Sequence, residues 1–70
     1  MKIKHRLETG FWFICKGWLA GYDQREEEFF LQAPAEPEDE YYHIESYPSV
    51  TGLLSAMREI GPLKTWKRAG

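Results

Sequence analysis

The hydrophobic pattern of the chain centres on residues 11–19, read FWFICKGWL, the most apolar run in the sequence. In an extended chain, successive side chains point to opposite faces, which here makes both faces apolar. One face would carry Phe11, Phe13, Cys15 and Leu19, and the other would carry Trp12, Ile14 and Trp18. Aromatic residues and a short length between turn residues favour a strand over a helix. We therefore predict one central strand covered on both faces, with Gly17 marking a bulge or the close approach of a neighbouring ring.

Weaker alternating segments flank this run. Residues 2–8 alternate charged and apolar side chains, which predicts a half-buried strand with a basic outer face. Thr9-Gly10 would then form the tight turn of a hairpin with the central strand. Residues 20–24 contain turn-forming residues and are predicted to reverse the chain again. Residues 26–32, EEEFFLQ, follow as a third strand whose second half is buried.

An acidic loop is predicted to interrupt the second half of the sheet. Residues 33–40, APAEPEDE, hold two prolines and no apolar period, so they are predicted to form an extended loop. Residues 41–46, YYHIES, are predicted to form a short fourth strand. Tyr42 and Ile44 would face the core on this strand, although tyrosine also fits the opposite register.

A C-terminal helix has the clearest local signature. Ser49 or Ser46 would cap its start beside Pro48, and Gly61 followed by Pro62 would end it, with the glycine in a left-handed conformation. The apolar stripe between these signals has helical spacing and comprises Val50, Leu53, Leu54, Met57 and Ile60.

These elements predict one α+β domain over residues 1–70, a small antiparallel meander of three to four strands with one C-terminal helix packed on one face. The tail LKTWKR offers Leu63 and Trp66 as apolar contacts, and it either adds a short edge strand or lies across the sheet. The opposite sheet face lacks a second helix. The tail, the acidic loop or another molecule must therefore cover it, and a homodimer is one such arrangement.

The charge distribution is strongly uneven, although the net charge is only −2. Residues 23–45 carry nine carboxylates and one arginine, which gives −8. Residues 1–22 and residues 46–70 each sum to +3, with four cations and one carboxylate apiece. Such segregation points to a surface that meets a partner of opposite charge, while acidic loops also serve solubility.

No residue pattern indicates an enzyme, a metal site or a cofactor. Cys15 with His43 or His5 would need an exposed, electropositive thiolate, whereas this cysteine lies in an apolar run. The histidines lack zinc-site spacing, and the acidic runs lack the pattern of a calcium loop. A Gly-rich phosphate loop and a Ser-His-Asp pattern are also missing. A single cysteine and an N-terminus without an apolar stretch lead us to expect a cytoplasmic, non-membrane protein.

We therefore expect a small non-enzymatic protein-binding module whose acidic surface contacts a basic partner. Small phage-type inhibitors, including anti-restriction and anti-CRISPR proteins, can present carboxylates in place of DNA phosphates to a nucleic-acid-binding protein. This chain shares with them size, charge and lack of motifs. The residues expected to bind the partner are Glu26, Glu27, Glu28, Glu36, Glu38, Asp39, Glu40, Tyr41 and Tyr42.

The sequence also fits two alternative functions. The basic residues Lys2, Lys4 and Arg6, together with the tail and its Trp66, would suit a small nucleic-acid-binding module. The net negative charge argues against direct nucleic-acid binding, because acidic segments repel phosphates. The chain would otherwise be a structural homodimer with no dedicated site.

Overall fold

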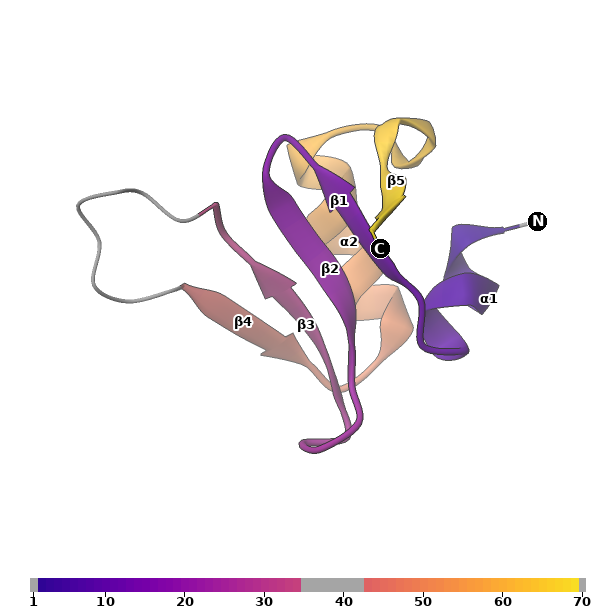
Figure 1. Cartoon of the computed structure of the whole chain (residues 1–70), viewed down its shortest axis with the longest axis vertical. Coiled ribbons are helices and arrows are strands. Elements are labelled where there is room, and N and C mark those ends of the chain that lie inside the picture. Colours follow the sequence, from indigo (N-terminus) through magenta and orange to yellow (C-terminus); the bar gives the residue numbers. More distant parts are fainter. Residues whose placement is uncertain (1, 35–42, 70) are drawn as a thin grey trace.

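A computed structural model describes residues 2–34 and 43–69 of the chain (Figure 1). The strands form one five-stranded antiparallel sheet in the order β4-β3-β2-β1-β5, with α2 behind it. The predicted α+β class is therefore confirmed, and the tail supplies the fifth strand. The elements are α1 (Ile3–Glu8), β1 (Trp12–Cys15), β2 (Trp18–Asp23), β3 (Glu28–Gln32), β4 (Ile44–Tyr47), α2 (Val50–Ile60), the 3-10 helix η1 (Leu63–Thr65) and β5 (Lys67–Ala69).

The predicted central strand over residues 11–19 is wrong, because this run is a hairpin. Lys16 and Gly17 have φ values of 51° and 83°, as a two-residue type I′ turn requires. Cys15 therefore pairs directly with Trp18, and both side chains face the helix. Leu19 pairs with Ile14 on the opposite face. Gly17 thus supplies the left-handed turn conformation, and the two faces differ from those of an uninterrupted strand.

The predicted strand at residues 2–8 is also wrong, because these residues form helix α1. Ile3 and Leu7 are four residues apart, a spacing that fits one face of a helix as well as one face of a strand. Leu7 is fully buried and Ile3 packs against the core, where α1 meets α2 and β2. Thr9 caps the C-terminus of α1, so the predicted hairpin turn at Thr9-Gly10 does not form.

The predicted turn at residues 20–24 is wrong as well. Ala20 is fully buried in the middle of β2, which continues to Asp23. The chain reverses instead after Asp23, whose side-chain Oδ1 accepts hydrogen bonds from the backbone N–H groups of Arg25 (2.8 Å) and Glu26 (3.4 Å). This local capping by an aspartate stabilises a turn. The predicted third strand is confirmed over Glu28–Gln32.

Helix α2 has the predicted bounds. Ser49 is the N-cap, and its Oγ accepts a hydrogen bond from the backbone N–H of Gly52 at 3.3 Å. Gly61 is the C-cap, but its φ of −176° is extended, so the predicted left-handed conformation is wrong. A Cβ at position 61 would lie 3.2 Å from Oγ1 of Thr65 and 3.5 Å from Sγ of Cys15. Glycine is favoured there by this close approach.

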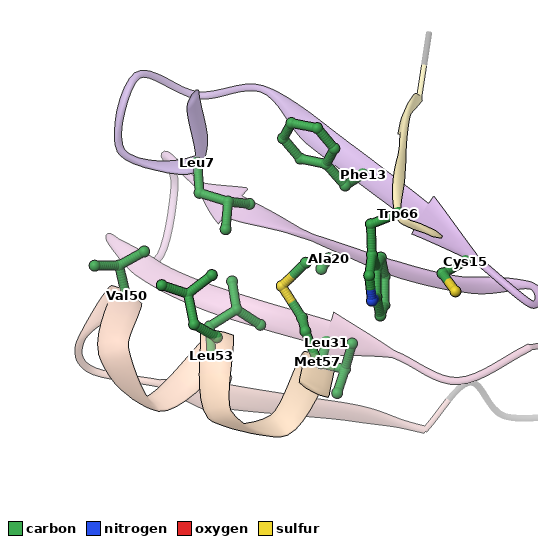
Figure 2. Close-up of a cluster of buried hydrophobic side chains, with 10 residues drawn as sticks. Leu7, Phe13, Cys15, Ala20, Leu31, Val50, Leu53, Met57 and Trp66 are labelled. Carbon is green, nitrogen blue, oxygen red and sulfur yellow. The ribbon is translucent and has the colours of Figure 1, made fainter. Parts of the chain in front are cut away.

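The core lies between α2 and the sheet, and both α1 and the C-terminal tail contribute side chains to it. The tail continues through η1 to β5, which pairs with β1. The indole of Trp66 is 5% exposed, and its Nε1 donates a hydrogen bond to the carbonyl of Gly61 at 3.3 Å. Figure 2 shows this ring reaching from the tail into the space between the sheet and α2. The buried cluster comprises Leu7, Phe13, Cys15, Ala20, Leu31, Val50, Leu53, Leu54, Met57 and Trp66.

None of the helices that the structure describes is long and apolar enough to cross a membrane. The sheet and α2 instead bury their apolar side chains against each other.

Candidate functional site

The sheet face turned away from α2, here called the outer face, exposes large apolar side chains. Trp12 is 44% exposed, Ile14 is 42% exposed and Ile44 is 55% exposed. Among the described elements, both α1 and α2 pack against the core and leave this face open (Figure 1). The prediction that Ile44 faces the core is wrong. Glu45 pairs with Leu31 and Ile44 with Gln32, so β4 has the opposite register.

Trp12 is held in place on the outer face although it is exposed. Its ring meets that of Phe30 edge-on, with centroids 5.3 Å apart and an interplanar angle of 85°. Its Nε1 donates a hydrogen bond to the carbonyl of Tyr22 at 3.3 Å. The ring also lies directly against Gly21, where any Cβ would overlap it. Three neighbours therefore fix the orientation of an exposed indole.

A groove of about 540 Å³ runs beside this indole. Strand β3 contributes Glu28, Phe30 and Gln32 to the lining, and the neighbouring strand β4 contributes Ile44 and Ser46. One part of the groove is apolar, whereas the turn between β2 and β3 makes the other part acidic. The lining residues are Trp12, Asp23, Arg25, Glu26, Glu28, Phe30, Gln32, Ile44 and Ser46.

The acidic part of the groove concentrates like charges. Asp23 and Glu28 lie directly opposite each other on β2 and β3. Like charges in that position destabilise a sheet. Glu26 lines the same groove, and Arg25 is the cation among the described lining residues. Three carboxylates against one guanidinium leave this part of the surface negative.

The residues that sequence reasoning assigned to partner binding divide into two groups. Glu26 and Glu28 line the groove, whereas Glu27 is exposed in the turn with a φ of 56° and does not line it. The remaining candidates lie outside the described residues: Glu36, Glu38, Asp39, Glu40, Tyr41 and Tyr42.

The apolar lining of the groove was missed by sequence reasoning. Trp12 and Phe30 are 18 positions apart, and the register of three strands brings them together across Gly21. A Lys-Gly pair read as a type I′ turn would have separated Trp12 from Trp18 and placed the two rings on opposite faces. That turn signal was present in the sequence, but the apolar residues on both sides of it concealed it.

A second hollow, of about 260 Å³, lies on the helix side of β4. Within it, Tyr47 donates a hydrogen bond from its hydroxyl to Oε2 of Glu45 at 2.7 Å. This hydrogen bond raises the pKa of Tyr47 to about 12, with smaller contributions from burial and from the negative charges of Glu45 and Glu59. The hydroxyl is therefore protonated at neutral pH and acts as a donor. A pKa this far above neutral does not suit a general base.

The candidate Cys–His pairs are not assembled. Cys15 is buried on β1, and its Sγ lies 3.4 Å from Oγ1 of Thr65. His43 precedes β4, which is separated from β1 by two intervening strands, and neighbouring strands lie about 4.8 Å apart. His5 belongs to α1 and is exposed. Over the described residues, no group of three or more His, Cys, Asp or Glu side chains could hold a metal ion.

Two basic segments from opposite parts of the sequence meet at Phe11. The guanidinium carbon of Arg6, from α1, lies 5.9 Å from the Phe11 ring centroid. The corresponding distance for Arg68, from β5, is 4.3 Å. The ring itself is 36% exposed. A basic surface with an aromatic centre therefore lies where α1 and β5 adjoin β1.

The chain has no match among protein-family models, curated proteins or solved structures.

Proposed function

We propose that the chain is a small non-enzymatic protein-binding module that holds a basic partner on the outer face of its sheet. The observation that carries the proposal is the groove in which an exposed, fixed indole, that of Trp12, adjoins the carboxylates of Asp23, Glu26 and Glu28. Apolar contacts from the ring would supply affinity, and the carboxylates would select and orient the partner.

The arrangement has the anatomy of a protein interface. Interface centres are enriched in aromatic residues, and tryptophan is prominent among the few residues that dominate binding energy. Charges around such a centre speed the encounter with an oppositely charged protein and suppress wrong partners. Trp12, Ile14 and Ile44 would form the centre of this interface, and the acidic turn would form one side of its rim.

The class of partner follows from the charge. Proteins that bind nucleic acids do so largely through lysine and arginine side chains that contact phosphates. A surface carrying several carboxylates competes for the same cations. We therefore propose a stoichiometric inhibitor of a nucleic-acid-binding protein, of the kind that phages direct against host defence, such as an anti-CRISPR or a DNA mimic.

The double variant Glu26→Gln/Glu28→Gln tests the proposal. Losing two carboxylates should weaken binding of the purified partner about tenfold, since each exposed ion pair contributes up to about 1 kcal/mol. The partner is first identified by capture on the immobilised wild type, and its affinity is then measured by calorimetry at two salt concentrations. Wild type, but not the variant, should also release labelled DNA or RNA from the partner at a one-to-one ratio.

The matched control removes two carboxylates elsewhere. Glu8 ends α1 and Glu59 lies near the end of α2, and both are exposed and outside the groove on the outer face. Glu8→Gln/Glu59→Gln should therefore bind like the wild type. Equal affinities for the two double variants would contradict the proposal.

A nucleic-acid-binding module is the second candidate function, and the convergence of Arg6 and Arg68 on Phe11 favours it. Aromatic rings beside cations bind single strands by stacking and by contacts to phosphates. If this surface is functional, the wild type should shift a labelled single strand at low salt, and Arg6→Gln/Arg68→Gln should bind at least tenfold more weakly. Retention of binding by that variant, or no binding by the wild type, would remove this candidate.

A further inference from the structure

We infer that the groove on the outer face receives an arginine side chain from an extended segment of the partner, with its guanidinium against the Trp12 indole and directed toward the carboxylates of Glu26 and Glu28. The inference rests on the proposed function and specifies its ligand. The fixed Trp12 indole and the groove beside it indicate a binding site, and the negative charge of the groove favours a cationic side chain.

The orientation of Trp12 is set before any ligand arrives. The edge contact with Phe30, the hydrogen bond to the carbonyl of Tyr22 and the absence of a Cβ at Gly21 together hold the ring. Binding to a side chain that is already ordered does not incur the entropy cost of immobilising it. An exposed ring that stays ordered is therefore suited to act as an anchor.

The chemistry of the lining favours a cation. A cation over the face of tryptophan is attracted by the ring quadrupole, and tryptophan is the best of the aromatic residues in this role. Carboxylates at one end of the same groove add a second attraction for the same group. Among the described lining residues, three carboxylates exceed the single cation, Arg25. A neutral apolar side chain would use the ring but leave the carboxylates without a partner.

Arginine matches this lining better than lysine does. A guanidinium is planar, stacks on aromatic faces and offers paired N–H donors to carboxylates, whereas an ammonium is a compact and strongly hydrated charge. The apolar part of the groove, at Ile44, would then contact a neighbouring aliphatic side chain of the same segment. The preferred ligand is therefore an arginine flanked by aliphatic residues in an extended chain.

The experiment uses the whole protein and a defined peptide, acetyl-Val-Arg-Val-amide. The three tryptophans give three indole N–H signals in a nitrogen–proton correlation spectrum, and Trp12→Phe assigns the signal on the outer face. We expect the peptide to shift the Trp12 signal in a saturable manner and to leave those of Trp18 and Trp66 in place, because these two rings face the helix side. The same peptide with lysine in place of arginine should bind severalfold more weakly than the arginine peptide.

Two controls isolate the charge of the ligand and the charge of the groove. The same peptide with citrulline, a neutral analogue of arginine, should bind at least tenfold more weakly. Glu26→Gln/Glu28→Gln should weaken binding of the arginine peptide to a similar extent, whereas Glu8→Gln/Glu59→Gln should not. Arg25→Gln should strengthen binding two- to fivefold, because it removes a competing cation from the groove.

The outcomes also separate this inference from the proposed function. An unchanged Trp12 signal, or equal shifts with arginine and citrulline, would overturn the arginine assignment even if Glu26→Gln/Glu28→Gln still lost the full partner. A Trp12 signal that moves with protein concentration alone would identify a second copy of the chain as the occupant and would also overturn it. If the arginine peptide binds as expected but Glu26→Gln/Glu28→Gln leaves the affinity for the full partner unchanged, the proposed function alone would be contradicted.

Discussion

Trp66→Ala is expected to lower the free energy of unfolding by about 3–5 kcal/mol, the range for truncating a large buried aromatic side chain. The indole is 5% exposed and fills the space between α2 and the sheet (Figure 2). Its removal leaves a cavity and also frees η1 and β5 from the core. A domain of this size has little stability in reserve, so most of the chain should unfold at moderate temperature. Urea denaturation followed by circular dichroism measures the change.

The control for this prediction is Trp12→Ala, which removes the same ring from the outer face. Trp12 is 44% exposed and packs mainly on Phe30 and Gly21. Its loss should therefore lower the free energy of unfolding by about 1–2 kcal/mol, which reflects one aromatic pair and partial burial. Equal losses for the two variants would show that Trp66 is not the centre of the core.

Gly21→Ala is expected to displace Trp12 from its place on the outer face. The added Cβ would overlap the indole, so the ring must rotate away and give up both its contact with Phe30 and its hydrogen bond to Tyr22. Forcing a methyl group into a packed site typically costs about 1–3 kcal/mol of stability. The Trp12 indole N–H signal in the nitrogen–proton correlation spectrum should move to the position of a solvated side chain. Denaturant unfolding measures the accompanying loss of stability.

A double-mutant cycle makes this prediction specific. Once the ring is absent, the methyl group at position 21 meets no indole, so Trp12→Ala/Gly21→Ala should be about as stable as Trp12→Ala alone. Gly52→Ala provides a second control, because its Cβ would have ordinary contact with Tyr47 at 3.4 Å. That helical substitution should be neutral or stabilising by up to about 1 kcal/mol. Additive effects of the two substitutions in the cycle would contradict the proposed steric relation.

The parts of the fold that could be predicted from sequence are those specified by neighbouring residues. Helix α2 has its capping serine, its apolar stripe and its terminal glycine within 13 consecutive positions, and its bounds agree with the prediction. Strand β3 likewise has its apolar residues close together. The sequence allows the C-terminal tail to form an edge strand or to lie across the sheet, and its pairing with β1 shows that it is an edge strand.

The N-terminal third could not be predicted because its pattern fits two structures. Ile3 and Leu7 have even spacing, which satisfies a strand, and are also four residues apart, which satisfies a helix. Burial against α2 and β2 selects the helix, and no local residue signals it. Lys16-Gly17 is a weak turn signal beside Asn-Gly, and the rings on both sides of it suggested one continuous strand.

The candidate site likewise has one part that could be predicted from sequence and one part that could not. Its acidic residues are visible in the sequence, which predicts Glu26 and Glu28 as binding residues, and both line the groove. Its aromatic wall depends on which residues stand opposite each other on different strands. Trp12 reaches Phe30 only across β2, where the missing side chain of Gly21 leaves room for the ring. Such a relation between three strands cannot be read from local periodicity.

The contribution of both Leu7 and Trp66 to one core has a consequence for biosynthesis. A ribosome makes the chain from its N-terminus, so α1 and the first hairpin leave the exit tunnel before residues 66–69 do. Until then, β1 has an unpaired edge and the space later filled by the last tryptophan stays open to water. The nascent chain therefore cannot complete its fold co-translationally until this segment emerges, and its aromatic residues are meanwhile accessible to chaperones.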